Sequence, residues 1–197
     1  MELLQPVILT GTHVRLEPLA KEHKEGLMAA VQDGDPWRLW YTMAPAPEAM
    51  GAEIDRRLAL QAVGSMLPFT VIEPASGEIV GMTSYMNVDL VHHRVEIGTT
   101  WYAKRVQRTG LNTEAKLLLL RYAFERLACI AVEWRTHFMN HQSRRAIEGL
   151  GAKLDGILRS HTVTADGSLR DTCVYSVIAS EWPAVRTHLE WQLKRPR

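Results

Sequence analysis

A polar turn centred on Gly110 joins a strand-like stretch to a strongly amphipathic helix, and this junction constrains the fold more than any other segment. Gly110 is free to adopt the positive φ angles that a tight cradle of backbone N–H groups needs. The helix expected to begin near Leu111 directs its unpaired amides and the positive end of its dipole towards the same point. The junction therefore predicts a phosphate-binding site, although a helix that merely follows a turn has the same local pattern.

Polar side chains around Gly110 strengthen this prediction. Gln107 and Arg108 supply side-chain donors, and Thr109 and Thr113 supply hydroxyl groups that complete an anion cage. Two common phosphate loops are absent from the sequence, because it contains neither GxxxxGKS/T nor a GxGxxG segment that opens a βαβ unit. A different kind of anion cradle is therefore expected over residues 107–113.

The length and charge of the chain exclude several classes of protein. Its 197 residues suit a single domain that covers residues 1–197. The 23 lysines and arginines nearly balance 22 aspartates and glutamates, and this formal charge of +1 gives no reason to expect nucleic acid or a membrane surface as partner. No apolar run reaches the roughly 18–20 residues of a membrane span.

Cysteine and histidine usage predicts a cytoplasmic protein without a metal. Cys129 and Cys173 lie far apart in apolar company, and the N-terminus lacks the basic segment of a signal peptide. The histidine pairs His92-His93 and His137-x-x-x-His141 have no cysteine or carboxylate that completes a ligand spacing.

The hydrophobic periodicity predicts an α+β fold with a mostly antiparallel sheet. Strands are expected at 14–17, 67–73, 79–88, 94–102, 131–138, 153–161 and 169–178, and helices at 20–32, 48–63, 111–127, 142–150 and 181–193. The three strands between 67 and 102 read as an antiparallel meander. The helix at 111–127 then forms one crossover in the middle of the chain.

The segment Gln107-x-x-Gly110-x-Asn112 resembles the Q/R-x-x-G-x-G/A loop of the GNAT N-acyltransferases. These enzymes bind acetyl-CoA by its pyrophosphate at the start of a central helix. The order of expected elements is also similar to theirs over nearly the whole chain. One departure is Asn112, which stands where the family usually has Gly or Ala, so that its side chain either crowds the pyrophosphate or hydrogen-bonds to it.

Three shorter segments resemble the branch of that family that contains the ribosomal-protein alanine N-acetyltransferases. They are Glu96-Ile-Gly98-Thr-Thr-Trp101-Tyr, Asn140-x-x-Ser143 and Leu150-Gly151-Ala152. The resemblance implies a central sheet with helices on both faces and two strands that splay apart at the CoA site. It also implies that the pantetheine arm of acetyl-CoA contacts Thr100, Trp101 and Tyr102.

Candidate catalytic groups follow from the same segments. Strict alternation along 94–102 puts Glu96 on the face of Gly98 and Thr100, where its carboxylate suits a general base, directly or through water. The alternative is an ion pair of Glu96 with Arg94 or another cation.

Residues 140–147 supply the remaining candidates on the CoA side. The resemblance places Asn140 near the pantetheine and Ser143 near the thioester sulfur as proton donor to the thiolate, because the tyrosine acid of other members is Ile147 here. Asn140 and Ser143 are equally explained as N-cap residues of a helix. Arg145, with its neighbour Arg144, suits the 3′-phosphate of CoA, but an exposed helix carries such arginines without a ligand.

Aromatic side chains supply candidate walls for the acceptor pocket. They are Trp37, Trp40, Tyr41 and Tyr85, and plain packing is the alternative explanation. The function expected is transfer of an acetyl group from acetyl-CoA to a primary amine, a peptide N-terminus or a small molecule, by direct attack in a ternary complex. The alternatives are a CoA-binding regulatory module without turnover and an O- or antibiotic acetyltransferase. The apolar residues of the C-terminal strand pair suit a homodimer or a higher homo-oligomer.

Overall fold

The computed structural model describes residues 4–164 and 166–195, and its strands form one eight-stranded sheet in the order β1-β2-β3-β4-β5-β6-β8-β7. The strands are β1 (Leu9–Thr10), β2 (Arg15–Pro18), β3 (Met66–Ile72), β4 (Ile79–Asp89), β5 (Arg94–Tyr102), β6 (Ala131–His137), β7 (Lys153–Val163) and β8 (Leu169–Ile178). The helices are α1 (Lys24–Gln32), α2 (Met50–Ala62), α3 (Gly110–Glu125), α4 (His141–Gly149) and α5 (Trp182–Lys194). Short 3-10 turns are η1 (Lys21–His23), η2 (Pro36–Arg38), η3 (Pro47–Ala49) and η4 (Lys104–Val106).

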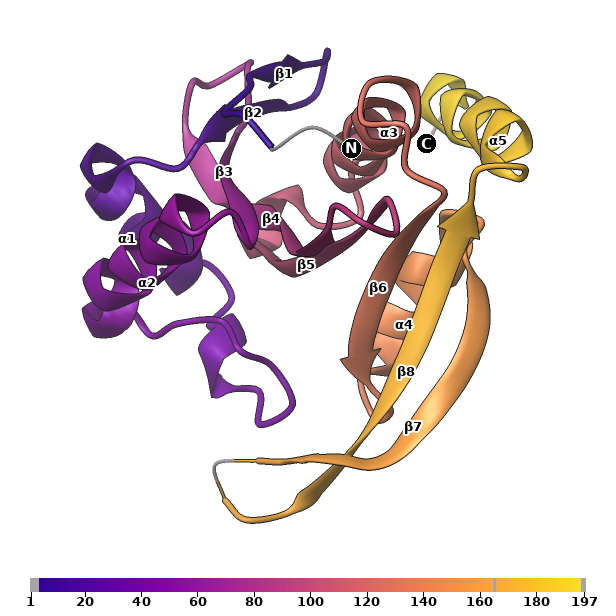
Figure 1. Cartoon of the computed structure of the whole chain (residues 1–197). Helices are drawn as coiled ribbons and strands as arrows, with labels where there is room; N and C mark the ends of the chain where they lie inside the picture. Colours follow the sequence, from indigo (N-terminus) through magenta and orange to yellow (C-terminus); the bar gives the residue numbers. More distant parts are fainter. Residues whose placement is uncertain (1–3, 165, 196–197) are drawn as a thin grey trace.

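All neighbouring strands run antiparallel except β5 and β6, which are parallel. The predicted fold class, with its meander and its single helical crossover, is therefore confirmed. The parallel pairing joins only Arg94–Glu96 of β5 to residues 131–133 of β6. Beyond Glu96 the two strands diverge, as Figure 1 shows, so the sheet opens between its two halves. A ligand with an extended backbone fits such an opening because both strands leave hydrogen-bonding groups unpaired there.

The helices cover both faces of the sheet and enclose its core (Figure 1). α1 and α2 pack over β4 and β3, while α3 crosses the other face beside α5. Every residue of β3 is buried, which explains why its sequence is apolar except for Thr70. Tyr85 on β4 is wholly buried, and its hydroxyl donates a hydrogen bond to the carbonyl of Leu119 on α3. The core thus fixes α3 against the sheet. No helix in the described part of the chain has the length and apolarity to cross a membrane.

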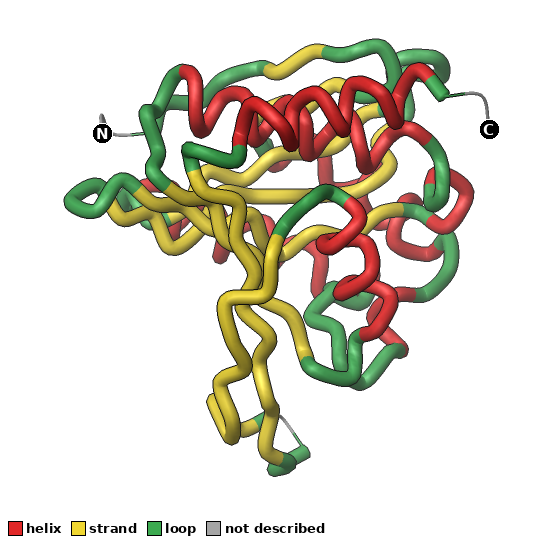
Figure 2. The backbone as a smooth tube through the Cα atoms, turned by 90° about the vertical axis from the view of Figure 1, so that its right-hand side faces the viewer, coloured by secondary structure: helices red, strands yellow, loops and turns green. Residues whose placement is uncertain are grey.

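A long hairpin of β7 and β8 projects from the rest of the molecule, as Figure 2 shows. β7 is the edge strand and is exposed along nearly its whole length. Large apolar side chains remain exposed on it and on its partner, among them Leu158, Val163 and Leu169. We call this hairpin (153–178) the arm.

A bulge in β5 changes which side chains share a face. Gly98 pairs with Ser84 and Trp101 pairs with Met82, so three steps along β5 correspond to two along β4. Thr99, inside the bulge, has a φ of 48°. Glu96 and Gly98 therefore face α2, whereas Thr100, the residue after the bulge, faces α3. The expectation that Thr100 shares the face of Glu96 is wrong, because strict alternation ends at the bulge.

Candidate functional site

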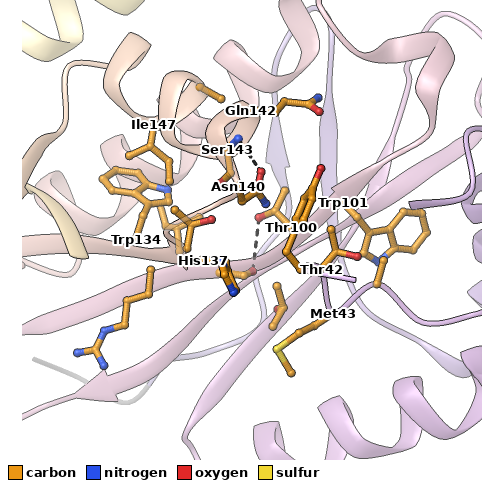
Figure 3. A pocket seen from close by; sticks show the side chains of 18 of the residues that line it. Thr42, Met43, Thr100, Trp101, Trp134, His137, Asn140, Gln142, Ser143 and Ile147 are labelled. Carbon is orange, nitrogen blue, oxygen red and sulfur yellow. Dashed lines mark hydrogen bonds between the residues drawn. The ribbon is translucent and has the colours of Figure 1, made fainter. Parts of the chain in front are cut away.

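A cavity of about 800 Å³ lies where β5 and β6 diverge, and Figure 3 shows side chains from both strands and from α4 reaching into it. Of the predicted site residues, those that line it are Tyr41, Glu96, Thr100, Trp101, Tyr102, Gln107, Arg108, Asn112, Asn140, Ser143 and Arg145. Those that do not line it are Trp37, Trp40, Tyr85, Thr109, Gly110, Leu111 and Thr113. The cavity thus brings together groups from distant parts of the sequence.

The turn before α3 is built differently from the expected cradle. Arg108 has the positive φ, 61°, whereas Gly110 is the first residue of α3 and has no positive φ. The expectation that Gly110 supplies the left-handed conformation is wrong, because the chain reverses two residues earlier. A Cβ atom on Gly110 would lie 3.1 Å from Cδ2 of His13. Gly110 thus avoids a tight contact with the His13 side chain, and it does not serve for backbone freedom.

Thr109 caps α3 and so uses the hydroxyl predicted for the anion cage. Its Oγ1 donates to the carbonyl of Val106 at 2.7 Å and accepts from the amide of Leu111 at 3.2 Å. Gln107 is also occupied, since its Nε2 donates to the carbonyl of Tyr102 at 3.1 Å. At this end Arg108 and Asn112 line the cavity beside the first turn of α3, whose amides are suited to an anion.

The buried carboxylate of Glu114 holds the first turns of α3 in place. It accepts backbone hydrogen bonds from Thr12 at 2.9 Å, from Val14 at 3.0 Å and also from His13. Sequence analysis missed this residue, because its partners lie a hundred positions away in a loop without a recognisable motif. Glu114 thereby ties the loop between β1 and β2 to the helix that carries the cradle.

The start of α4 forms one wall of the cavity. Asn140 caps the helix, since its Oδ1 accepts the amide of Ser143 at 3.0 Å. The hydroxyl of Ser143 makes no hydrogen bond within the described part of the chain and lies at the cavity surface. Ile147 closes the wall behind it. Arg144 is occupied, because its guanidinium donates to the hydroxyl of Tyr175 at 3.0 Å and covers the ring of Phe138.

Glu96 is a buried carboxyl at the point where β5 and β6 part. Its side chain accepts from Nδ2 of Asn87 at 2.7 Å and lies 3.7 Å from Nε of Arg135. Burial raises the pKa of Glu96 above its ordinary value, and the contacts with Asn87 and Arg135 offset this only in part. The expected alternative, an ion pair of Glu96 with Arg94 or another cation, is therefore confirmed for another cation, Arg135. Arg94 is the wrong partner, because it pairs with Glu133 on the neighbouring strand.

Lys116 on α3 is a buried amine that sequence analysis missed. Only 5% of its surface is exposed, yet it lines the cavity. Its Nζ lies 3.0 Å from Oγ1 of Thr100 and 3.2 Å from Oγ1 of Thr83. Burial lowers the pKa of Lys116 to about 7. The sequence does contain a sign that Lys116 lies near the predicted cradle. Position 116 follows Asn112 by one helical turn, and its lysine interrupts an apolar helix face.

His137 occupies the end of β6 and is also buried beside the cavity. Its Nδ1 accepts the amide of Met139 at 3.0 Å, so the neutral ring carries its proton on Nε2. Burial lowers the pKa of His137, and the charge of Arg170 lowers it further. The ring of Trp40 packs edge-on against it with centroids 4.9 Å apart. No three His, Cys, Asp or Glu side chains gather as a metal site in residues 4–164 and 166–195.

The cavity end opposite the α3 terminus is lined by basic groups of β6 and the arm. They are Arg135, His161 and Arg170. The side chain of Arg170 is half-buried, and its Nε atom is buried without a hydrogen-bond partner among the described residues. The charge of Glu96 attracts this guanidinium. Tyr41 lines the cavity near this end, whereas Tyr85 belongs to the core and Trp37 packs against the core from outside the cavity.

Comparison with known proteins gives a family and a relative. Residues 13–153 match the family described as acetyltransferase (GNAT) domain. A protein of Bacillus subtilis (strain 168) with the provisional name ribosomal N-acetyltransferase YdaF is 34% identical over 106 residues. The match covers 54% of this chain and 57% of that protein, so the chain spans little more than half the length of this curated relative.

Solved structures resemble the whole fold. A GCN5-related N-acetyltransferase from Brucella melitensis superimposes with a TM-score of 0.84 at 33% identity, and the match covers 98% of this chain and 87% of that one. RimJ of Mycobacterium smegmatis, solved in complex with CoA-disulfide, gives a TM-score of 0.80 at 22% identity over 95% of each chain. At that identity the likeness concerns the fold alone.

Proposed function

Because the chain belongs to the GNAT acetyltransferase family, we propose that it transfers the acetyl group of acetyl-CoA to a primary amine. The observation that carries this proposal is one continuous cavity that runs from the N-terminus of α3 to the buried carboxyl of Glu96. One end suits a polyphosphate and the other suits proton removal from an amine. We infer that residues 1–197 act as one catalytic domain in the cytoplasm.

The residues at the cavity fit acetyl-CoA. The first-turn amides of α3, Arg108 and Asn112 would hold the pyrophosphate, and exposed Arg145 the 3′-phosphate. The stretch of β5 from Thr100 to Tyr102, which does not pair with β6, would hold the pantetheine. Buried polar atoms without a partner among the described residues support a ligand here, namely Nε1 of Trp101, the hydroxyl of Tyr102 and Nε1 of Trp134.

The proposed chemistry is direct attack in a ternary complex. The amine nitrogen attacks the thioester carbonyl, the carboxylate of Glu96 takes the proton of the amine directly or through water, and the thiolate leaves. The hydroxyl of Ser143 donates a proton or a hydrogen bond to that thiolate. Cys129 and Cys173 do not line the cavity, and burial raises the pKa of Cys129 to about 11, which argues against a covalent acyl-cysteine.

The acceptor is proposed to be a peptide N-terminus or a small amine. The name of the Bacillus relative supports a ribosomal-protein N-terminus, whereas the guanidinium of Arg170, with its Nε buried and without a hydrogen-bond partner among the described residues, favours an amine that carries a carboxylate or phosphate nearby. The exposed apolar side chains of the arm suit a homodimer contact, which sedimentation at several protein concentrations tests.

A thiol-release assay with acetyl-CoA and a panel of free amino acids, amino-acid amides, N-terminal peptides and alcohols tests the proposal. We expect release with at least one amine and a mass increase of one acetyl group on it. Tight CoA binding without release in the whole panel would favour the regulatory module. Release with alcohols alone would favour O-acetyl transfer.

A further inference from the structure

The amine of Lys116 is buried in the cavity wall without a counter-ion. Its two hydrogen-bond partners, Thr83 and Thr100, are neutral hydroxyls whose oxygens also lie 2.8 Å from each other. No carboxylate in the described residues forms an ion pair with it. Burial of an unpaired cation destabilises the folded protein. A buried lysine beside a cavity is therefore better explained by a function in the cavity than by packing. An ammonium group has three hydrogens, and the two hydroxyls accept two of them.

The position of Lys116 connects it to the place where strands β5 and β6 separate. Its partner Thr100 lies beyond Glu96, the last residue of β5 that pairs with β6, and the bulge turns Thr100 towards α3. Figure 3 shows Thr100, Asn140 and Ser143 turned towards the same part of the cavity. The third hydrogen of Lys116 is therefore available where the acyl end of the pantetheine arm would lie.

The chemistry of acyl transfer supplies the missing partner for this cation. When the amine nitrogen bonds to the carbonyl carbon, the π electron pair of the carbonyl moves to its oxygen, which becomes negative. The pair returns as the carbon–sulfur bond breaks and the thiolate departs. A fixed donor at that oxygen is most effective in a buried site, because charge develops there only during the reaction.

We propose that Lys116 is a further catalytic residue, whose ammonium group donates its third hydrogen to the thioester carbonyl oxygen and stabilises the negative charge of the tetrahedral intermediate. This role rests on the proposed acetyl transfer. It differs from the roles of Glu96 and Ser143, which handle the protons of the amine and the thiolate. Lys116 keeps its proton throughout the step.

The proposal predicts a distinct pH dependence. The titratable and charged groups around the cavity and against this part of α3 are Tyr41, Tyr85, Glu96, Tyr102, Arg108, Arg135, His137, Arg145, His161 and Arg170. With a pKa of about 7, Lys116 loses its charge as the pH rises through neutrality. Turnover should therefore fall on the alkaline side when Lys116 loses its proton, whereas Glu96 governs the acidic side.

Three lysine variants test this role by steady-state kinetics. Lys116→Met should lower kcat by roughly 10²–10³, the usual cost of one oxyanion donor, with the KM for acetyl-CoA changed less than about twofold. Lys116→Arg should retain more activity and move the alkaline limb upwards, because a guanidinium does not titrate there. Lys24→Met, at an exposed lysine of α1, is the control and should behave as wild type. An unchanged kcat in Lys116→Met, or an unchanged alkaline limb in Lys116→Arg, would overturn the proposal.

A binding measurement gives a readout that does not depend on turnover. Carboxymethyl-CoA carries a carboxylate close to where the acetyl oxygen would lie. Calorimetry at pH 6 should show that Lys116→Met loses at least about tenfold in affinity for carboxymethyl-CoA but less than about twofold for CoA, as for one lost charge-assisted hydrogen bond. Equal losses for both ligands, or none, would overturn the role of Lys116. A wild-type protein that releases no thiol with any acceptor would instead refute acetyl transfer.

Discussion

The two ends of the cavity are built in different ways. The cradle end takes Gln107, Arg108 and Asn112 from one seven-residue segment, 107–113, of which only Leu111 is buried, together with the first-turn amides of one helix. The reaction end takes Glu96, Lys116 and His137 from three elements, and none of these side chains is more than 6% exposed. Burial shifts the pKa of each in the direction that favours its neutral form. A local backbone pattern is enough to bind an anion, whereas proton transfer needs groups that only tertiary structure removes from water.

The largest effect that tests this difference between the two cavity ends is expected from a substitution of Glu96. Glu96→Gln keeps the acceptor for Asn87 but removes the base, so we expect kcat to fall by roughly 10²–10⁴ and the acidic limb of the pH profile to flatten. That limb should lie above the ordinary pKa of a glutamate, since burial raises the pKa of Glu96. Steady-state rates between pH 5 and 9 measure both effects, and CoA affinity should be unchanged.

The matched control is Glu133→Gln on the neighbouring strand. Glu133 is half-buried and pairs with Arg94 and Arg135, but it does not line the cavity. Its loss should change kcat by less than about threefold, because partly exposed ion pairs contribute little. If both variants lose the same activity, the effect is general electrostatics, and Glu96 is not the base.

Lys116 tests whether burial at the reaction end has a cost for stability. Its pKa falls from 10.5 in the unfolded chain to about 7 in the fold, so between these values the unfolded chain binds more protons. Wild-type stability should therefore rise with pH from about 7 to about 10.5. Lys116→Met removes this penalty and should unfold at higher urea concentration at pH 6.5, with a difference of a few kcal/mol that shrinks as the pH rises. A variant that is less stable than wild type at every pH would contradict the unpaired burial of Lys116.

Gly110 tests the cradle end alone. Gly110→Val places a side chain against His13 and shifts the first turn of α3, so CoA affinity should fall by about 10- to 100-fold, equivalent to one or two charge-assisted hydrogen bonds. Isothermal calorimetry measures this loss. Gly149→Val on α4 meets open space and should bind CoA as wild type does. Normal affinity in Gly110→Val would place the anion site elsewhere.

The same contrast explains what the sequence could predict. The element order, the sheet class and the start of α3 were predictable, because they depend on periodicity and on neighbouring residues. The short strand β1 was not expected, since two residues carry no alternation. The bulge at Thr99, the left-handed Arg108 and the burial of Lys116 were also missed. Each depends on contacts with residues distant in sequence, and local propensity carries no information about such contacts.

The smallest expected effect concerns the aromatic loop before α2, where a residue assigned to the acceptor wall is 61% exposed. Trp40 packs its ring against His137 and Tyr41, which both line the cavity. Trp40→Ala should raise the KM for the amine by about three- to tenfold, as the loss of one aromatic contact does, with the melting temperature and CoA affinity nearly unchanged. Trp191→Ala is the matched control, since that ring on α5 is 55% exposed, stacks on His188 and does not line the cavity. An equal rise in both variants, or a large loss of stability in Trp40→Ala alone, would remove Trp40 from the acceptor site, so that at the reaction end Tyr41 alone of the predicted aromatic wall would remain.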